Sequence, residues 1–306
     1  MAPSFKIWIK AFRLRTLFLA LASIAMGTFL AAANHKFDPV IFILCSLTAI
    51  FLQILSNLSN DYGDYINGAD SVYRVGPARA VQAGEISTGA MRRAIWIFSS
   101  LSLCSGIYLL VIGIKFSPLN FFGFFMIGIL AIIAAIKYTA GARPYGYSGL
   151  GDISVFIFFG WVGVMGTYYL QAEDVSSSLF LPATSCGLFS VAVLNINNIR
   201  DIESDKRAGK KSIPVRIGRQ KAKIYHWWLL IGGVLCTVIY TLINYAGPFQ
   251  WLFLLSLPLI VKNGIMISKK NNPQEINPYL KQMAISTLIF VLTFGAGLLL
   301  STFVVF

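Results

Sequence analysis

The chain has 306 residues, of which 57% are hydrophobic and only 12% are charged. A soluble domain of this size would struggle to stay in solution with that balance, so we predict a membrane protein embedded in a lipid bilayer. The formal net charge of +13 would suggest nucleic-acid binding in a soluble protein. In a membrane protein basic residues gather in the loops between spans, so we expect no nucleic-acid partner.

Apolar runs of roughly 20 residues, the length that crosses a hydrocarbon core, recur along the whole sequence. They predict nine transmembrane helices, at residues 15–34, 39–58, 93–114, 118–138, 152–171, 179–199, 224–246, 248–268 and 282–305. The first run follows a basic segment and ends near Ala31-Ala32-Ala33, as a signal peptide does, but we expect it to remain as the first span. The predicted fold is all-α, a polytopic membrane protein with one domain over residues 1–306.

Basic residues predict the orientation. If the N-terminus lies inside, nine spans place all but two of the 25 Lys and Arg residues on the same side, the exceptions being Lys36 and Lys115. The positive-inside rule then predicts a cytoplasmic N-terminus, cytoplasmic active-site loops and an outer C-terminus. A bacterial inner (plasma) membrane is the expected location.

Two inside loops, residues 59–92 and 200–223, are much longer than the others, and each begins with a cluster of Asn and Asp. This similarity indicates an internal repeat. If the spans continue as helices, Asn57 and Asp61 share one face, as do Asn60 and Asp64. In the second cluster Asn197, Asp201 and Asp205 form a column with the spacing i, i+4, i+8.

Carboxylates stacked on one helical face repel one another by a few tenths of a kcal/mol per pair, so these columns predict a cation between them. Mg²⁺ fits best, since it binds carboxylates, water and phosphate oxygens. We predict these metal ligands and catalytic residues: Asp61, Asp64, Asp201 and Asp205. The neighbouring amides are predicted to bind substrate: Asn57, Asn60, Asn197 and Asn198.

Basic residues follow both clusters, namely Arg74 and Arg79 after the first and Lys206 and Lys210 after the second. Carboxylates, a metal and basic side chains together describe a diphosphate site. The alternative reading is that acidic residues are solvated helix ends and that basic residues serve orientation and attraction to anionic lipid. Residues 137–152 join glycines with Arg143 and Tyr145. This segment is either a short connection or an acceptor-binding loop, in which Arg143 pairs with a carboxylate and the tyrosines (Tyr138, Tyr145 and Tyr147) pack on an aromatic ring.

Four segments in order resemble the UbiA superfamily of intramembrane prenyltransferases, and within it the 1,4-dihydroxy-2-naphthoate polyprenyltransferases of menaquinone synthesis. They are residues 53–64, 74–79, 143–152 and 198–205. The resemblance implies nine helices around a central cavity, with an Asn-x-x-x-Asp-x-x-x-Asp pattern in each half that binds Mg²⁺ and diphosphate. The second pattern is complete, whereas the third position of the first is Gly68. Whether Asp61 supplies the missing acid is left open.

The resemblance further implies transfer of a polyprenyl group from polyprenyl diphosphate to 1,4-dihydroxy-2-naphthoate, with loss of CO₂ and diphosphate, giving demethylmenaquinol. A second hypothesis is a related prenyltransferase for 4-hydroxybenzoate or heme. A third is a cation-coupled transporter, because duplicated halves and intramembrane carboxylates also mark transporters.

Overall fold

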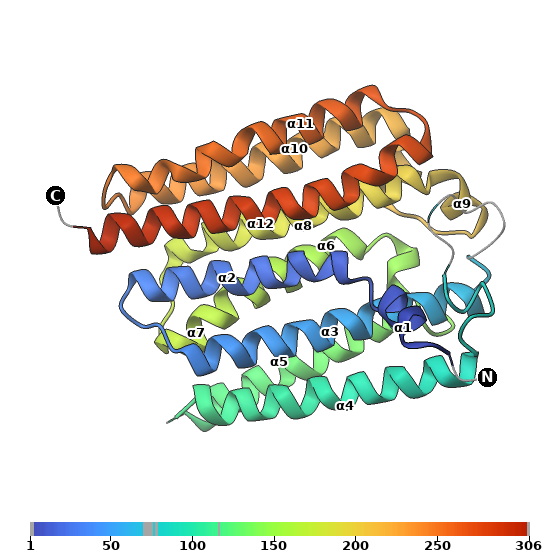
Figure 1. The fold of residues 1–306 in the computed structure, drawn as a ribbon, viewed down its shortest axis with the longest axis horizontal. Coiled ribbons are helices and arrows are strands. Elements are labelled where there is room, and N and C mark those ends of the chain that lie inside the picture. Colours follow the sequence, from blue (N-terminus) through green and yellow to red (C-terminus); the bar gives the residue numbers. More distant parts are fainter. Residues whose placement is uncertain (1–2, 70–75, 77–78, 116, 305–306) are drawn as a thin grey trace.

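The computed structural model describes residues 3–69, 76, 79–115 and 117–304. Throughout these residues every regular element is a helix, and nine helical segments are long and apolar enough to cross a membrane. The prediction of an all-α polytopic membrane protein is therefore confirmed. The long helices run side by side along the longest axis of the molecule (Figure 1).

The N-terminal half supplies the first five spans. Short α1 (Phe5–Phe12) is followed by a 3₁₀ turn (Leu14–Thr16) and α2 (Leu17–Ala33). Next come α3 (Pro39–Ile66), α4 (Thr88–Gly113) and α5 (Pro118–Lys137). After a connecting segment with a 3₁₀ turn (Tyr145–Ser148), α6 (Gly151–Val155) continues through a π-helical stretch (Phe156–Met165) into α7 (Gly166–Ala172).

The C-terminal half supplies the remaining four. A 3₁₀ turn (Ser177–Leu179) leads into α8 (Phe180–Arg200), short α9 (Ile202–Arg207) and α10 (Ile213–Ile243), which is interrupted at Gly218. A 3₁₀ segment (Pro248–Ser256) leads into α11 (Leu257–Lys269), and α12 (Pro273–Phe303) ends the fold.

Local sequence explains where several of these helices begin. The Asp38 carboxylate accepts hydrogen bonds from the backbone N–H groups of Val40 and Ile41, at 2.8 and 3.1 Å, and Pro39 occupies the first helical position of α3. Ser117 before α5 and Asn272 before α12 cap in the same way, and each is also followed by proline. Such caps satisfy backbone donors that a helix leaves open at its start.

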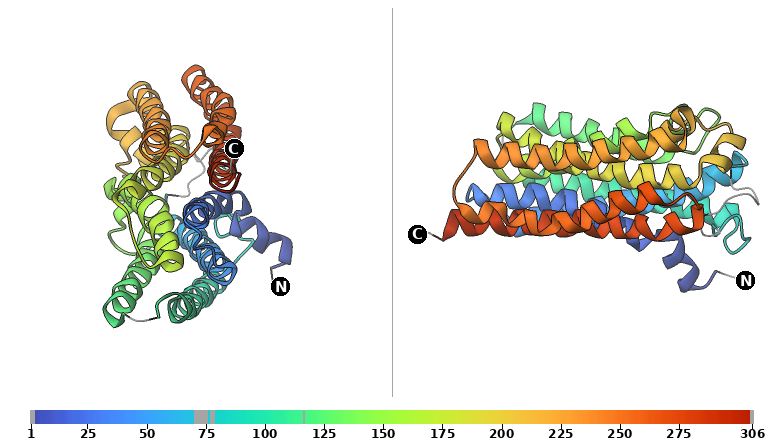
Figure 2. Two further views of the ribbon diagram at one scale, coloured as in Figure 1. Left: turned by 90° about the vertical axis from the view of Figure 1, so that its left-hand side faces the viewer. Right: turned by 90° about the horizontal axis from the view of Figure 1, so that it is seen from above.

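The main core lies between α2, α8, α10 and α12, which pack against one another. Seen end on (Figure 2), α10, α11 and α12 lie on one side of the bundle and α4 and α5 on the opposite side. No residue of α5 is buried. The bundle is thus densely packed in its C-terminal half and more open towards α4 and α5.

Hydropathy places most span limits within a few residues, but it ends the second span too early and begins the seventh and ninth too late, since α10 begins at Ile213 and α12 at Pro273 where residues 224 and 282 were predicted. The second span was predicted to end at residue 58, whereas α3 continues to Ile66 and so carries the first Asn/Asp cluster as two further helical turns. The N-terminus and α9 lie at one end of the bundle and the C-terminus at the other (Figure 1), as an odd number of spans requires.

Candidate functional site

The end of α3 determines the position of Asp64. The Gly68 backbone adopts a left-handed conformation with φ of 71° and donates to Tyr65 O at 3.2 Å, while Ala69 N donates to Asp64 O at 2.8 Å. This is a Schellman motif, which favours glycine because a side chain is strained at positive φ. It ends the helix directly after the turn that carries Asp64.

α9 ends in the same way. Gly209 has φ of 73° and donates to Lys206 O at 3.2 Å, and Lys210 N donates to Asp205 O at 2.9 Å. Asp64 and Asp205 therefore occupy the same position, third from the end of their helices, and Gly68 corresponds to Gly209. In this register Gly68 ends a helix, and it is not the position at which the first half lacks an acid.

The same equivalence pairs Asn60 with Asp201, since each lies four residues before the matched aspartate. The first half therefore has an amide where the second half has a carboxylate. The missing negative charge of the first half lies at Asn60, whose side-chain oxygen accepts a hydrogen bond from Thr139 at 3.0 Å.

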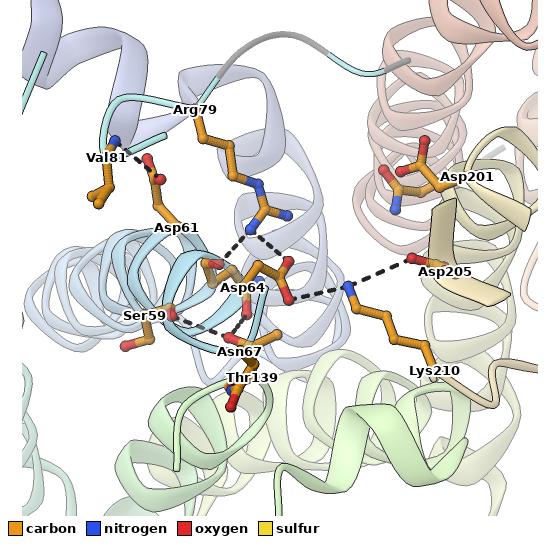
Figure 3. A network of polar contacts seen from close by, with 12 residues as sticks. Ser59, Asp61, Asp64, Asn67, Arg79, Val81, Thr139, Asp201, Asp205 and Lys210 are labelled. Carbon is orange, nitrogen blue, oxygen red and sulfur yellow. Dashed lines mark hydrogen bonds and ion pairs between the residues drawn. The ribbon is translucent and has the colours of Figure 1, made fainter. Parts of the chain in front are cut away.

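A network of ion pairs joins the two halves (Figure 3). The Asp64 carboxylate contacts Arg79 at 2.5 Å and Lys210 at 3.0 Å, and it accepts a hydrogen bond from the Tyr147 hydroxyl at 2.6 Å. The Lys210 ammonium also lies 3.5 Å from Asp205. A single lysine therefore bridges the equivalent carboxylates of the two halves.

Close packing at Gly63 makes this arrangement possible. A Cβ atom at this position would lie 2.5 Å from the Thr139 carbonyl carbon and 2.6 Å from its oxygen. Because backbone atoms cannot yield to a side chain, only glycine lets α3 approach the segment after α5 so closely. That approach holds Asp64 beside the segment that carries Tyr147.

Asp201 has a different partner. Arg200 donates to both of its carboxylate oxygens, at 2.8 and 2.6 Å, and also to Asn197 and Asn277 at 2.8 and 2.7 Å. Asp201 lies between the end of α8 at Arg200 and the start of α9 at Ile202, with φ of −97° and ψ of 10°, so the predicted column of Asn197, Asp201 and Asp205 is divided between two helices. The bidentate guanidinium fixes the orientation of Asp201.

Asp61 is turned away from this group. Its two carboxylate oxygens accept hydrogen bonds from the backbone N–H groups of Ala80 and Val81, at 3.1 and 3.4 Å. Asp61 is buried but is not among the residues that line the charged cavity described next. Its position fits a role in holding the segment after α3 against that helix.

A polar cavity of about 210 Å³ lies at this end of the bundle. Four carboxylates and five basic side chains line it: Asp64, Asp152, Asp201, Asp205, Arg13, Arg15, Arg79, Lys210 and Lys281. The amides that the sequence predicts to bind substrate also line it: Asn57, Asn60, Asn197 and Asn198. Both signs of charge at one buried site suit a ligand that carries several negative charges together with a cation.

An apolar cavity of about 380 Å³ adjoins the polar one, between α3, α4, α5 and the π-helical stretch. The two cavities share a wall formed by Gln53, Asn57, Asn60, Tyr138, Val155, Phe159 and Leu194. Phe158, Phe159, Phe124 and Phe125 lie in the wall of the apolar cavity. A ligand with an anionic head and an apolar tail fits this pair of cavities.

Burial affects the ionisable groups of the site. It raises the pKa of Asp205 to about 6, against the lowering effect of Lys210, while Asp201 and Asp64 raise the value further. Burial also raises the pKa of Tyr138, and nearby Asp152, Tyr145, Asp64 and Asp205 act in the same direction. The Tyr138 phenol thus stays protonated between Asp152 and the bridged carboxylates.

Not every predicted residue reaches the cavities. Arg143 and Lys206 are exposed and line neither cavity, and Arg74 lies outside the described residues. Tyr145 lines the apolar cavity, where its hydroxyl donates to Ala134 O at 3.0 Å and lies 2.9 Å from Ser154. The predicted acceptor loop therefore contributes Tyr145 and not Arg143.

Sequence reasoning assigned no role at the site to the lining residues Arg13, Arg15, Asp152 and Lys281, whereas Tyr138 and Tyr147 belong to the segment predicted to bind the acceptor. Arg13 and Arg15 had been attributed to orientation alone, although they lie at the 3₁₀ turn between α1 and α2. Asp152 is the last residue of the glycine-rich segment that resembles the UbiA superfamily, but the resemblance assigns it no role. A lone acid at the start of a predicted span was the available signal.

The fold and the site together define a class, an integral membrane protein whose helical bundle holds a charged cavity beside an apolar one. Residues 20–288 match the UbiA prenyltransferase family. The chain therefore belongs to this family.

Curated relatives match almost the whole chain. A 1,4-dihydroxy-2-naphthoate octaprenyltransferase of Escherichia coli (strain K12) is 46% identical over 294 residues, which cover 96% of this chain and 95% of the relative. One from Haemophilus influenzae is 44% identical over 298 residues, covering 96% of each chain.

Solved structures share the fold. A UbiA homolog from Archaeoglobus fulgidus bound to GPP and Mg²⁺ matches with a TM-score of 0.67 and 17% identity, over 96% of this chain and 99% of that chain. The apo structure of a UbiA homolog from Aeropyrum pernix K1 matches with a TM-score of 0.67 and 18% identity, over 93% and 97% respectively.

Proposed function

We propose that this protein transfers a polyprenyl group from polyprenyl diphosphate to 1,4-dihydroxy-2-naphthoate, with release of CO₂ and diphosphate, giving demethylmenaquinol. The observation that carries the proposal is the shared wall of the two cavities, which places a charged site for a diphosphate next to an apolar site for its prenyl chain. The choice of acceptor is supported by the names of the relatives in Escherichia coli and Haemophilus influenzae.

Mg²⁺ is the metal we propose, and the donors of the site suit it. Asp64, Asp201 and Asp205 offer hard oxygen ligands in one cavity, and Asn197 and Asn198 add neutral oxygens. Within the described residues no three acidic, His or Cys side chains already lie together as a metal site. Phosphate oxygens and water would supply the remaining ligands, as is usual for Mg²⁺.

Bound Mg²⁺ would neutralise the diphosphate and make it a better leaving group. The chain's own residues bind and orient the substrate. Arg79 and Lys210, which both pair with Asp64, would stabilise the negative charge that develops on the departing oxygen. The apolar cavity holds the prenyl chain and excludes water from the allylic carbon, which protects an allylic cation from hydrolysis.

Asp61 is not among the metal ligands that we now propose, since two backbone N–H groups occupy its oxygens. We extend the proposal to one domain over residues 1–306, in a bacterial plasma membrane with the polar cavity facing the cytoplasm. The side bias of the 25 basic residues supports this orientation.

The test uses the purified protein in lipid nanodiscs with a polyprenyl diphosphate and an acceptor panel of 1,4-dihydroxy-2-naphthoate, 4-hydroxybenzoate and heme. Mass spectrometry should detect a decarboxylated, prenylated naphthalene product that requires Mg²⁺ and disappears with EDTA. Product from another acceptor alone would contradict the naphthoate assignment. Cation-driven uptake of a solute by proteoliposomes, without Mg²⁺-dependent product, would favour the transporter alternative.

A further inference from the structure

Asp152 is an acid of the polar cavity that the ion-pair network leaves out. It lies in the first turn of α6, is 6% exposed and lines the polar cavity. Val155, three residues further along the same helix, belongs to the wall that both cavities share. Residues three apart lie on one helical face, so Asp152 points to the place where the two cavities meet.

The surroundings of Asp152 differ from those of the other acids in this cavity. Asp64 and Asp205 contact Lys210, and Asp201 is held by Arg200. In the part of the chain that the structure describes, no lysine or arginine forms an ion pair with Asp152. The Tyr225 hydroxyl of α10 donates to its Oδ2 atom at 3.0 Å. Its negative charge is therefore held in place without being neutralised by a cation of the protein.

Gly151 allows the aromatic wall beside this acid to close. A Cβ atom at this position would lie 2.6 Å from the Tyr138 hydroxyl, so a larger residue would push the Tyr138 ring away from the start of α6. The ring lines both cavities. An aromatic acceptor placed against Tyr138, next to the apolar cavity, would present its polar substituents to Asp152.

We propose that Asp152 is the general base that accepts a proton from the acceptor hydroxyl, an inference that rests on the proposed function. Loss of this proton raises electron density at the adjacent ring carbon, which bears the carboxylate. That carbon forms a bond to the allylic carbon as the allylic C–O bond breaks and diphosphate leaves with the bonding electrons. The hydroxyl becomes a ketone, and the ring carbon now carries both the prenyl group and the carboxylate.

The remaining step returns the proton. The intermediate is a β-keto carboxylate, which loses CO₂ and leaves its electron pair as an enolate. Protonated Asp152 then gives the proton back to the enolate oxygen, which restores the aromatic hydroxyl. No proton is gained or lost over the cycle, and no oxidant or reductant is needed.

Tyr225 is a positioning residue in this scheme, because its hydroxyl orients the Asp152 carboxylate and touches no reacting atom. Removing that hydroxyl in Tyr225→Phe should slow transfer about 10-fold to 100-fold, the effect of one lost hydrogen bond to a charged group. In an Asp152→Asn background the same change should have no further effect, since the base is already absent. An equal loss in both backgrounds would contradict this role.

The main test compares Asp152→Asn and Asp152→Glu with wild type in nanodiscs. General-base catalysis contributes about 10²-fold to 10⁴-fold, so Asp152→Asn should lose that much turnover while Asp152→Glu recovers part of it. Affinity for an unreactive thiolodiphosphate analogue of the prenyl donor should stay unchanged, because Asp152 acts on the acceptor. Glu203→Gln is the matched control, since Glu203 is exposed and lines neither cavity.

A second acceptor sharpens the result. A fluorinated dihydroxynaphthoate whose hydroxyl is already ionised at the assay pH needs no base, so the loss in Asp152→Asn should shrink markedly with it. Near wild-type turnover of Asp152→Asn, an equal loss of analogue affinity, or the same loss with both acceptors would overturn the inference. Absence of any prenylated product from the wild type would instead overturn the proposed function, and the inference with it.

Discussion

Lys206 and Lys210 lie only four residues apart, at the end of α9, but their surroundings differ. The Lys210 ammonium lies 3.0 Å from Asp64, 3.5 Å from Asp205 and 4.8 Å from the centre of the Tyr147 ring. Lys206 is exposed and lines neither cavity. Sequence spacing made both equally good candidates for a diphosphate contact. The two lysines differ because the Schellman turn at Gly209 changes the direction of the chain between them.

This difference predicts unequal effects of Lys210→Met and Lys206→Met. A charge-assisted hydrogen bond is worth about 1.5–3 kcal/mol, so Lys210→Met should weaken binding of the thiolodiphosphate analogue about 10-fold to 100-fold. Lys206→Met should leave it almost unchanged. Isothermal titration calorimetry in the presence of Mg²⁺ measures both. Equal weakening by the two substitutions would show that the assignment of Lys210 is wrong.

The roles of several acidic residues depend on their hydrogen-bond and ion-pair partners, and the spacing of residues in the sequence did not reveal those partners. Helical periodicity correctly brought Asn60 and Asp64 to one cavity. It also grouped Asp61 with them, because it contains no information on Ala80 and Val81, whose backbone N–H groups bind that carboxylate. Arg200 was attributed to orientation, whereas its guanidinium holds Asp201.

At the scale of whole elements, the ends of α3 and α9 build the site. Hydropathy ended the second span at residue 58 because the following turns are polar, yet α3 remains helical to Ile66. Those turns have protein partners in place of lipid, notably the segment that follows α5. Hydropathy measures only the preference of residues for lipid, so it cannot predict the contact between the end of α3 and the segment after α5. The matching glycines, Gly68 and Gly209, were visible in the sequence and give the register of the two halves.

The contact at Gly63 gives a test of this packing. In Gly63→Ala the new methyl group would meet the Thr139 backbone at 2.5 Å, so we expect destabilisation by about 1–3 kcal/mol and slower prenyl transfer as Asp64 is displaced. Gly123→Ala in α5 is the control, because nothing lies within 4 Å of its Cβ position. Thermal unfolding in nanodiscs at one scan rate should show a lower Tm for Gly63→Ala alone. An unchanged Tm would contradict the close approach of these backbones.

At the scale of the whole molecule, two halves with related helix ends meet over one charged cavity. The sequence predicted the nine spans, since lipid-facing helices must be apolar throughout. Periodicity did not locate the apolar cavity, because residues that line a cavity are as apolar as residues that face lipid; only the resemblance to the UbiA superfamily implied a central cavity. α5 contributes to the wall of that cavity and has no buried residue. The volume and shape of the cavity depend on how the helices pack, and sequence periodicity carries no information on that packing.

The central claim is that Asp64 and Asp205, one from each half, act on a single prenyl diphosphate. Its most direct measurement is the turnover of Mg²⁺-dependent transfer to 1,4-dihydroxy-2-naphthoate by wild type, Asp64→Asn, Asp205→Asn and the double variant. Each single substitution should lower turnover about 100-fold or more, and the double variant should lose little beyond that, because residues that act as one unit are not additive. Near wild-type turnover of either single variant, or multiplied losses in the double variant, would contradict the claim.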